Sequence, residues 1–169
     1  FLIGRLAPRE LLPGSMDWWV GDAVGCLVLV PLVLALGAVR SFRGGTPAVQ
    51  ALRLVLALAM MAAVLLFIFY SSEGKYWIMC TFPVLLMVLV ISGEGGLFAA
   101  VFFAALFCVA AANVGHRPFG NSYFNGVMLG IQVYVTAIAV VALVLSGLGR
   151  LGLSRLPRSE EHTSELQSH

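Results

Sequence analysis

The stretch LVLALAMMAAVLLFIFY, residues 54–70, runs for 17 positions without a charged side chain. A helix needs about 20 apolar residues to cross a bilayer core of ~30 Å, so this stretch is nearly long enough to span it. It predicts a transmembrane helix. Because the run is slightly short, we expect either a tilt or a local thinning of the bilayer around it.

The composition of the whole chain points to the same solvent. The 169 residues are 60% hydrophobic and 11% charged, and the mean hydropathy is +0.98. Soluble domains are about half apolar and a quarter charged, so we expect this chain to lie in lipid. The net charge is only +2 and no basic run occurs, which excludes nucleic acid as an expected partner. The three cysteines lie inside apolar runs without a C-x-x-C motif, so we interpret them as packing residues: Cys26, Cys80 and Cys108.

Four further apolar stretches flank the first: residues 18–39, 76–92, 95–114 and 124–147. These runs are continuous and about twice as long as the ~10-residue strands of a membrane β-barrel, which we therefore reject. The predicted fold is all-α, a polytopic transmembrane bundle of about five spans. Only Gly93 and Glu94 separate the third span from the fourth, which predicts a tight helical hairpin.

Arginine and lysine positions predict the orientation. Five spans place the two edges of the chain on opposite sides of the membrane. The basic residues divide into Arg40, Arg43, Arg53, Arg150 and Arg155 on one side and Arg5, Arg9, Lys75 and Arg117 on the other. The cluster between the first two spans favours the first side as cytoplasmic. We expect an external N-terminal edge and a cytoplasmic C-terminal edge.

The two edges of the chain have unusual sequences. The chain starts at Phe1 rather than methionine, which indicates a fragment or a processed chain. Residues 158–169 read RSEEHTSELQSH, with one apolar residue in twelve. This segment looks like the translation of a sequencing-library adapter, so we exclude it and take residues 1–157 as the membrane domain.

Asp22 is the ionisable residue of the first span, about 6 Å from its start. Such a group inside a membrane is a functional hypothesis by default, here a ligand or proton contact beside Trp18 and Trp19. The alternative is structural, because a carboxylate is favoured at a helix N-terminus. Gln132, in the last span, has the same two interpretations: part of a site, or a hydrogen bond that joins two helices.

Small residues and prolines predict how the helices pack. The pairs Gly21/Gly25 and Gly126/Gly130 have the spacing that lets helix backbones approach closely. Pro31 and Pro83 each remove a backbone donor, which predicts either a fixed bend or a hinge.

The loop between the last two spans contains His116 and Arg117. His116 has a side chain that titrates near neutral pH, and Arg117 has one that binds anions. Simple solvation of the loop is the alternative. The sequence contains no nucleophile–base pair, metal-ligand cluster or phosphate-binding glycine loop, so we predict no catalytic residue, metal or cofactor.

Residues 18–36, WWVGDAVGCLVLVPLVLAL, resemble a signature of the bacterial membrane-associated sensor domain of type one. The signature consists of an aromatic pair, Gly-Asp, a further glycine and a later proline. The resemblance continues in order through Phe82-Pro83, the glycines at 93–96, Gly115, Pro118-Phe119 and Gln132, and covers about residues 1–148. In one respect the chain departs from the family, which tends to have an arginine before the glycine of the short turn where this chain has Ser92.

This resemblance implies the last five helices of an eight-helix sensory module in a bacterial inner membrane. It also implies a cytoplasmic output domain after the last span: a histidine kinase, diguanylate cyclase or phosphodiesterase, in two-component or cyclic-di-GMP signalling. We expect the bilayer and an unknown small-molecule or membrane signal as partners, with a homodimer by analogy only. The alternatives are a transporter fragment and a structural membrane subunit.

Overall fold

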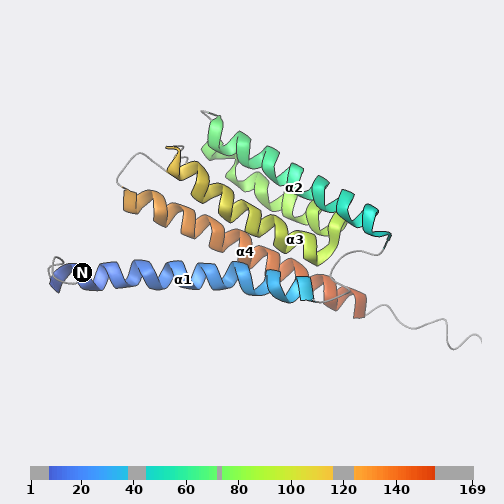
Figure 1. Cartoon of the computed structure of the whole chain (residues 1–169), viewed down its shortest axis with the longest axis horizontal. Helices are drawn as coiled ribbons and strands as arrows, with labels where there is room; N and C mark the ends of the chain where they lie inside the picture. The colour runs from blue at the N-terminus through green and yellow to red at the C-terminus, as the bar shows by residue number, and fades with distance from the viewer. Residues whose placement is uncertain (1–7, 38–44, 72–73, 116–123, 155–169) are drawn as a thin grey trace, which may run out of the picture.

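A computed structural model of the chain describes residues 8–37, 45–71, 74–115 and 124–154. Long helices make up most of these ranges. Figure 1 shows the elements in order: α1 (Pro8–Gly37), α2 (Pro47–Tyr70), the 3-10 helix η1 (Gly74–Cys80), α3 (Thr81–Asn113) and α4 (Phe124–Ser154). No strand occurs within these ranges. The predicted all-α transmembrane bundle is confirmed, because four helical segments are long and apolar enough to cross a membrane.

One of those four segments is two spans folded back on each other. It runs from Tyr76 to Asn113, 38 residues, which as one straight helix would measure ~57 Å, nearly twice the bilayer core. Its backbone is interrupted at Gly93, where φ is 78° and ψ is −170°. Figure 1 shows the arm before Gly93 lying between α2 and the arm after it. We call these the first arm (81–92) and the second arm (95–113) of α3, and Gly93 and Glu94 form the turn between them. Counted this way, the bundle has the five spans that the sequence predicts.

Glycine is required at the turn for two separate reasons. The φ and ψ of Gly93 lie in a region that residues with a Cβ rarely adopt. At Gly96, an added Cβ would lie 1.9 Å from Oγ and 2.4 Å from Cβ of Ser92. Ser92 is buried, and its hydroxyl donates a 2.8 Å hydrogen bond to the carbonyl of Val88. The two arms therefore approach closely because Gly96 has no side chain.

The helix ends follow local capping rules. Thr46 caps α2 by accepting a hydrogen bond from the backbone N–H of Val49 at 3.4 Å, and Pro47 follows at the first helical position. The 24 residues of α2 measure ~36 Å, enough to cross the core with some tilt. Helix α2 thus starts before the predicted span at residue 54 and includes Arg53.

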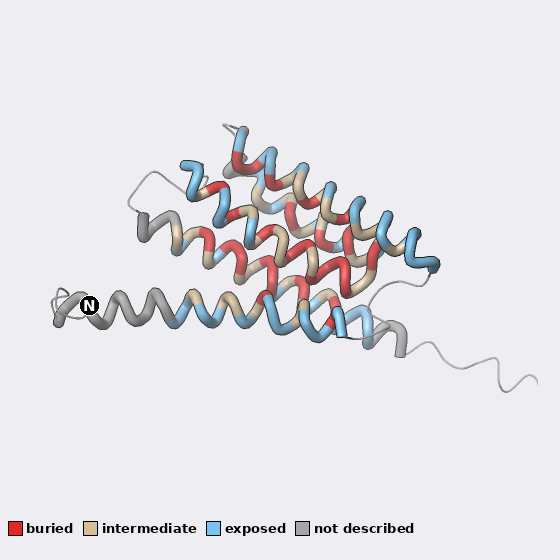
Figure 2. The backbone as a smooth tube through the Cα atoms, viewed as in Figure 1, coloured by how far each residue is buried: buried red, intermediate tan, exposed pale blue. Residues whose placement is uncertain are grey.

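The core lies between α2, the two arms of α3 and α4 (Figure 2). Along α2, buried side chains recur every three or four positions at Ala57, Met61, Leu65 and Ile68. The second arm of α3 buries mainly small residues, at Gly96, Ala100, Ala104, Cys108 and Ala111. Helix–helix association in lipid depends on such close packing, because lipid tails are as apolar as the side chains they surround.

Helix α1 lies at the edge of this core. Val28 and Ala35 are its buried residues within the part whose side chains are described, while Val33 and Leu34 are well exposed. Figure 1 shows that the C-terminal half of α1 is the part that lies along α4. Helices α1 and α4 end, α2 begins and α3 turns back at one end of the bundle (Figure 1). We call this the turn end.

Candidate functional site

The structure brings two of the predicted site residues together. A Cβ added at Gly21 of α1 would lie 3.7 Å from Nε2 of Gln132 on α4. Gln132 is half-buried. A Cβ at Gly21 would therefore make ordinary van der Waals contact with the amide of Gln132, and the close-packing role of Gly21 stays a prediction.

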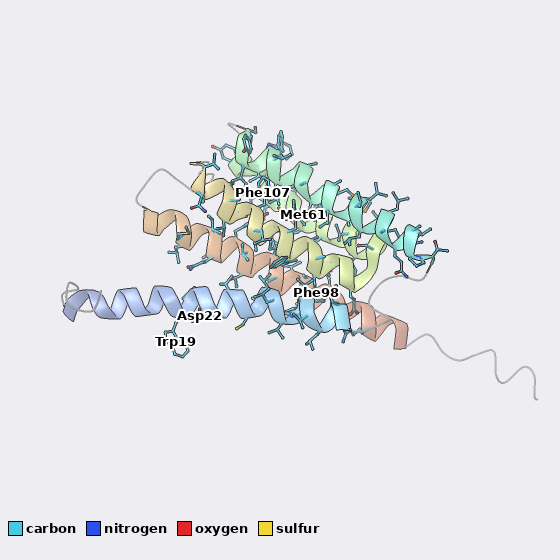
Figure 3. The ribbon with its side chains drawn as sticks, viewed as in Figure 1. Trp19, Asp22, Met61, Phe98 and Phe107 are labelled. Atoms are coloured by element: carbon cyan, nitrogen blue, oxygen red, sulfur yellow. The ribbon has the colours of Figure 1, made fainter. Side chains whose placement is uncertain are left out.

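Trp19 and Asp22 lie elsewhere on α1. The Trp19 side chain is 79% exposed, and Figure 3 shows it extending from α1 away from α4. Asp22 is also exposed. Among the described residues, both side chains lie on the surface of the bundle rather than between helices. Their assignment as signal contacts stays a prediction.

Several other predicted residues have described positions. A Cβ added at Gly25 would meet nothing within 4 Å, and Gly130 is half-buried. Pro83 is the third residue of α3. Proline is tolerated there because the first backbone N–H groups of a helix have no intrahelical partner. The break in α3 is at Gly93 rather than at this proline.

Four predicted residues remain without a described side chain. His116 and Arg117 lie outside the described residues. Trp18 and Gly126 belong to α1 and α4, but their side-chain surroundings also lie outside the described part of the chain. The roles predicted for these four residues stay predictions.

An ion pair between Glu94 and Arg150 lies at the turn end. The sequence analysis did not predict this pair. Nε of Arg150, near the end of α4, donates to Oε1 of Glu94 at 2.9 Å and to Oε2 at 3.1 Å. Nη2 donates to Oε2 at 2.5 Å. The Arg150 side chain is 70% exposed and that of Glu94 21%. This geometry ties the last turns of α4 to the turn between the two arms of α3.

The surroundings of Glu94 favour its charged form. Glu94 lies in the turn, outside the two spans that it joins. Hydrogen bonding from Arg150 lowers the pKa of the carboxyl below its ordinary value of 4.5, the charge of Arg150 and a hydrogen bond from Ser146 lower it further, and partial burial opposes them. Glu94 is therefore ionised at neutral pH and holds Arg150 by both charge and geometry.

A pocket of about 550 Å³ lies beside this ion pair. Its walls come from three helices: Pro31 and Leu34 of α1, Phe98 of α3, and Ser146, Gly147 and Arg150 of α4. Figure 3 marks Phe98 in the region where the three helices meet. The walls are mostly apolar, and the polar groups of Ser146 and Arg150 belong to the α4 side.

A third polar contact joins the hairpin to α4 inside the bundle. The hydroxyls of Thr81 and Tyr134 are 2.7 Å apart and both residues are buried. Thr81 begins the first arm of α3, and Tyr134 belongs to α4. This hydrogen bond and the Glu94–Arg150 pair therefore link α3 to α4 at two separate positions along α4.

Family comparison identifies the kind of domain that this bundle forms. The MASE1 family model matches residues 2–149. The chain belongs to the MASE1 family of membrane-associated sensor domains. Neither a curated protein nor a solved structure matches the chain.

The MASE1 match confirms the resemblance that the sequence showed. MASE1 domains are sensory, non-catalytic membrane domains, which agrees with the prediction that this part of the chain does no chemistry of its own. The match covers all of α1, α2 and α3, and α4 up to residue 149.

One sequence signal could have revealed the ion pair. Glu94 and Arg150 are 56 positions apart, but a five-span topology places both at the same membrane face. Glu94 is the acidic residue of the short turn, and Arg150 follows the last apolar stretch closely. The pocket gave no comparable signal, because its walls are ordinary apolar residues from three separate helices.

Proposed function

We propose that this domain receives a signal within the membrane and passes it through α4 to a cytoplasmic output domain. The output domain would be a histidine kinase, a diguanylate cyclase or a phosphodiesterase that follows α4 in the chain. The location is then the inner membrane of a bacterium, with the edge after α4 in the cytoplasm. The membership of the chain in a sensory family supports the receiving role.

The observation that carries the relay is the bond between the end of α4 and the turn of α3. Arg150 holds Glu94 through three hydrogen bonds at the last described turns before the chain leaves the bundle. A rearrangement of the hairpin therefore changes the position or freedom of the end of α4. A signal produces such a change only if it has different affinities for two helix packings.

Signal recognition would involve the α1–α4 contact. Gly21 and Gln132 lie side by side there, and the exposed side chains of Trp19 and Asp22 project from the same part of α1. We propose these residues as the first place to look for a small-molecule or membrane signal, and a homodimer as a way for two output domains to meet.

The first experiment is to read the DNA downstream of the codon for Pro157. A continuous reading frame that encodes a kinase, cyclase or phosphodiesterase domain supports the proposed relay. A native stop codon, or further apolar spans instead of an output domain, would overturn it.

The second experiment measures the output activity of the full-length protein in membrane vesicles. We expect Arg150→Gln to change that activity because it releases the end of α4 from the turn of α3. Arg53→Gln, on α2, is the matched control and should leave activity unchanged. Equal activity in the Arg150→Gln variant and the unaltered protein, at equal membrane levels, would refute a relay through this contact.

A further inference from the structure

The pocket between α1, α3 and α4 combines an apolar interior with a cation. We propose that it binds an anionic phospholipid of the surrounding bilayer, with one acyl chain between the helices and the phosphate at Arg150. This inference concerns lipid binding and holds whether or not the domain signals to an output enzyme.

The walls of the pocket match an acyl chain. Pro31, Leu34 and Phe98 supply apolar surface from two helices. The volume of about 550 Å³ lies within the range of ~300–1,000 Å³ that is typical of small-molecule sites. Leu34 is 68% exposed, so the pocket is open at the surface of the helices that the structure describes. A bilayer lipid reaches such an opening by lateral diffusion, without crossing water.

The arginine at the pocket specifies the charge of the head group. A guanidinium has five N–H donors and binds phosphate in a bidentate manner. The three bonds to Glu94 use Nε and Nη2, so Nη1 takes no part in them. Because the Arg150 side chain is 70% exposed, a phosphate has access to it. The hydroxyl of Ser146 also lines the pocket, but it donates its one hydrogen to Glu94, so Arg150 is the donor for the phosphate.

The test uses the purified 169-residue chain in nanodiscs that contain equal amounts of phosphatidylglycerol and phosphatidylcholine. Native mass spectrometry then identifies the lipids that stay on the protein after release. We expect one phosphatidylglycerol to be retained in preference to phosphatidylcholine by a factor on the order of five, the effect of one arginine near an anionic group.

One pair of variants at glycines and one set of three at charged residues separate the pocket from the rest of the surface. A Cβ added at either Gly147 or Gly149 would meet nothing within 4 Å, but of the two only Gly147 lines the pocket. Gly147→Leu should therefore displace the lipid, and Gly149→Leu should retain it. Arg150→Gln should abolish the preference for phosphatidylglycerol, whereas Arg53→Gln and Glu94→Gln should keep it. Glu94→Gln breaks the ion pair but leaves the cation in place.

Four outcomes would overturn the proposal. The first is equal retention of the two phospholipids by the unaltered chain, and the second is retention of neither. The third is unchanged retention in Gly147→Leu. The fourth is a different occupant of the pocket: either a free fatty acid carried through purification, or a second copy of the chain whose dimer mass disappears in Gly147→Leu but not in Gly149→Leu.

Discussion

Replacing Gly96 with alanine should destabilise the hairpin of α3, and the structure indicates by how much. The new Cβ would lie 1.9 Å from Oγ and 2.4 Å from Cβ of Ser92, far inside ordinary van der Waals contact. Ser92 cannot rotate away from both contacts, because its Cβ is fixed to the backbone of the first arm. The backbone of the turn must therefore shift, and overpacking of this kind costs about 1–3 kcal/mol.

The assay is reversible unfolding of the purified chain in mixed micelles, followed by helical circular dichroism as the denaturing detergent increases. Gly25→Ala is the matched control, since an added Cβ there meets nothing within 4 Å. We expect Gly96→Ala to lower the free energy of unfolding by about 1–3 kcal/mol relative to the unaltered chain. The control should leave this free energy nearly unchanged or raise it slightly, because alanine favours a helix over glycine.

A double-mutant cycle then attributes the effect to the close contact. Ser92→Ala removes Oγ but keeps the Cβ at 2.4 Å, so it should rescue Gly96→Ala little. Ser92→Gly removes both atoms and should recover most of the loss, after correction for the cost of glycine in a helix. The reasoning is refuted if Gly96→Ala unfolds like the unaltered chain, or if Ser92→Ala rescues it as well as Ser92→Gly does.

The remaining predictions concern the polar contacts. Glu94→Gln should lower the free energy of unfolding by about 0.2–1 kcal/mol, because the partner Arg150 is largely exposed; a loss above 3 kcal/mol in the same titration would contradict this. The pKa of Glu94 is lowered in the fold, so the stabilisation by the pair is complete above the unfolded pKa, near 4.5, and is lost as pH falls through the lower folded pKa. Unfolding titrations from pH 7 to pH 3 should show this loss in the unaltered chain but not in Glu94→Gln. Thr81→Val removes a buried hydrogen bond to α4 and should cost about 0.5–1.5 kcal/mol in the unfolding assay; Thr81→Ser, which keeps the hydroxyl, should cost less, and the reverse order would count against the bond. Asp22→Asn combined with Gln132→Leu should change the signal response of the full-length protein without preventing membrane insertion; an unchanged response would remove both residues from the proposed signal site.

Sequence and structure agree on the features that depend only on the order of residues along the chain. Whether a segment such as residues 54–70 spans a membrane depends on how many apolar residues follow one another, and this can be counted directly in the chain. The tight turn at Gly93 was predictable for a similar reason. Two spans separated by only two residues must be joined by a tight turn, because no longer loop is available between them. The first-span motif with Gly21 and Asp22 likewise led to the family that the comparison confirms.

The tertiary structure decided which of the few polar side chains meet. Pairing of Glu94 with Arg150, or of Thr81 with Tyr134, depends on the rotation and depth of each helix relative to its neighbours. Apolar periodicity hardly constrains that rotation when nearly every face of a helix is apolar. The sequence by itself therefore determined the number of spans, the hairpin and the family. Only the assembled bundle decided that the ion pair and the pocket lie together at the turn end, and that Trp19 lies on the surface. In lipid, contacts between helices follow from close packing, because the surrounding lipid tails are as apolar as the side chains themselves.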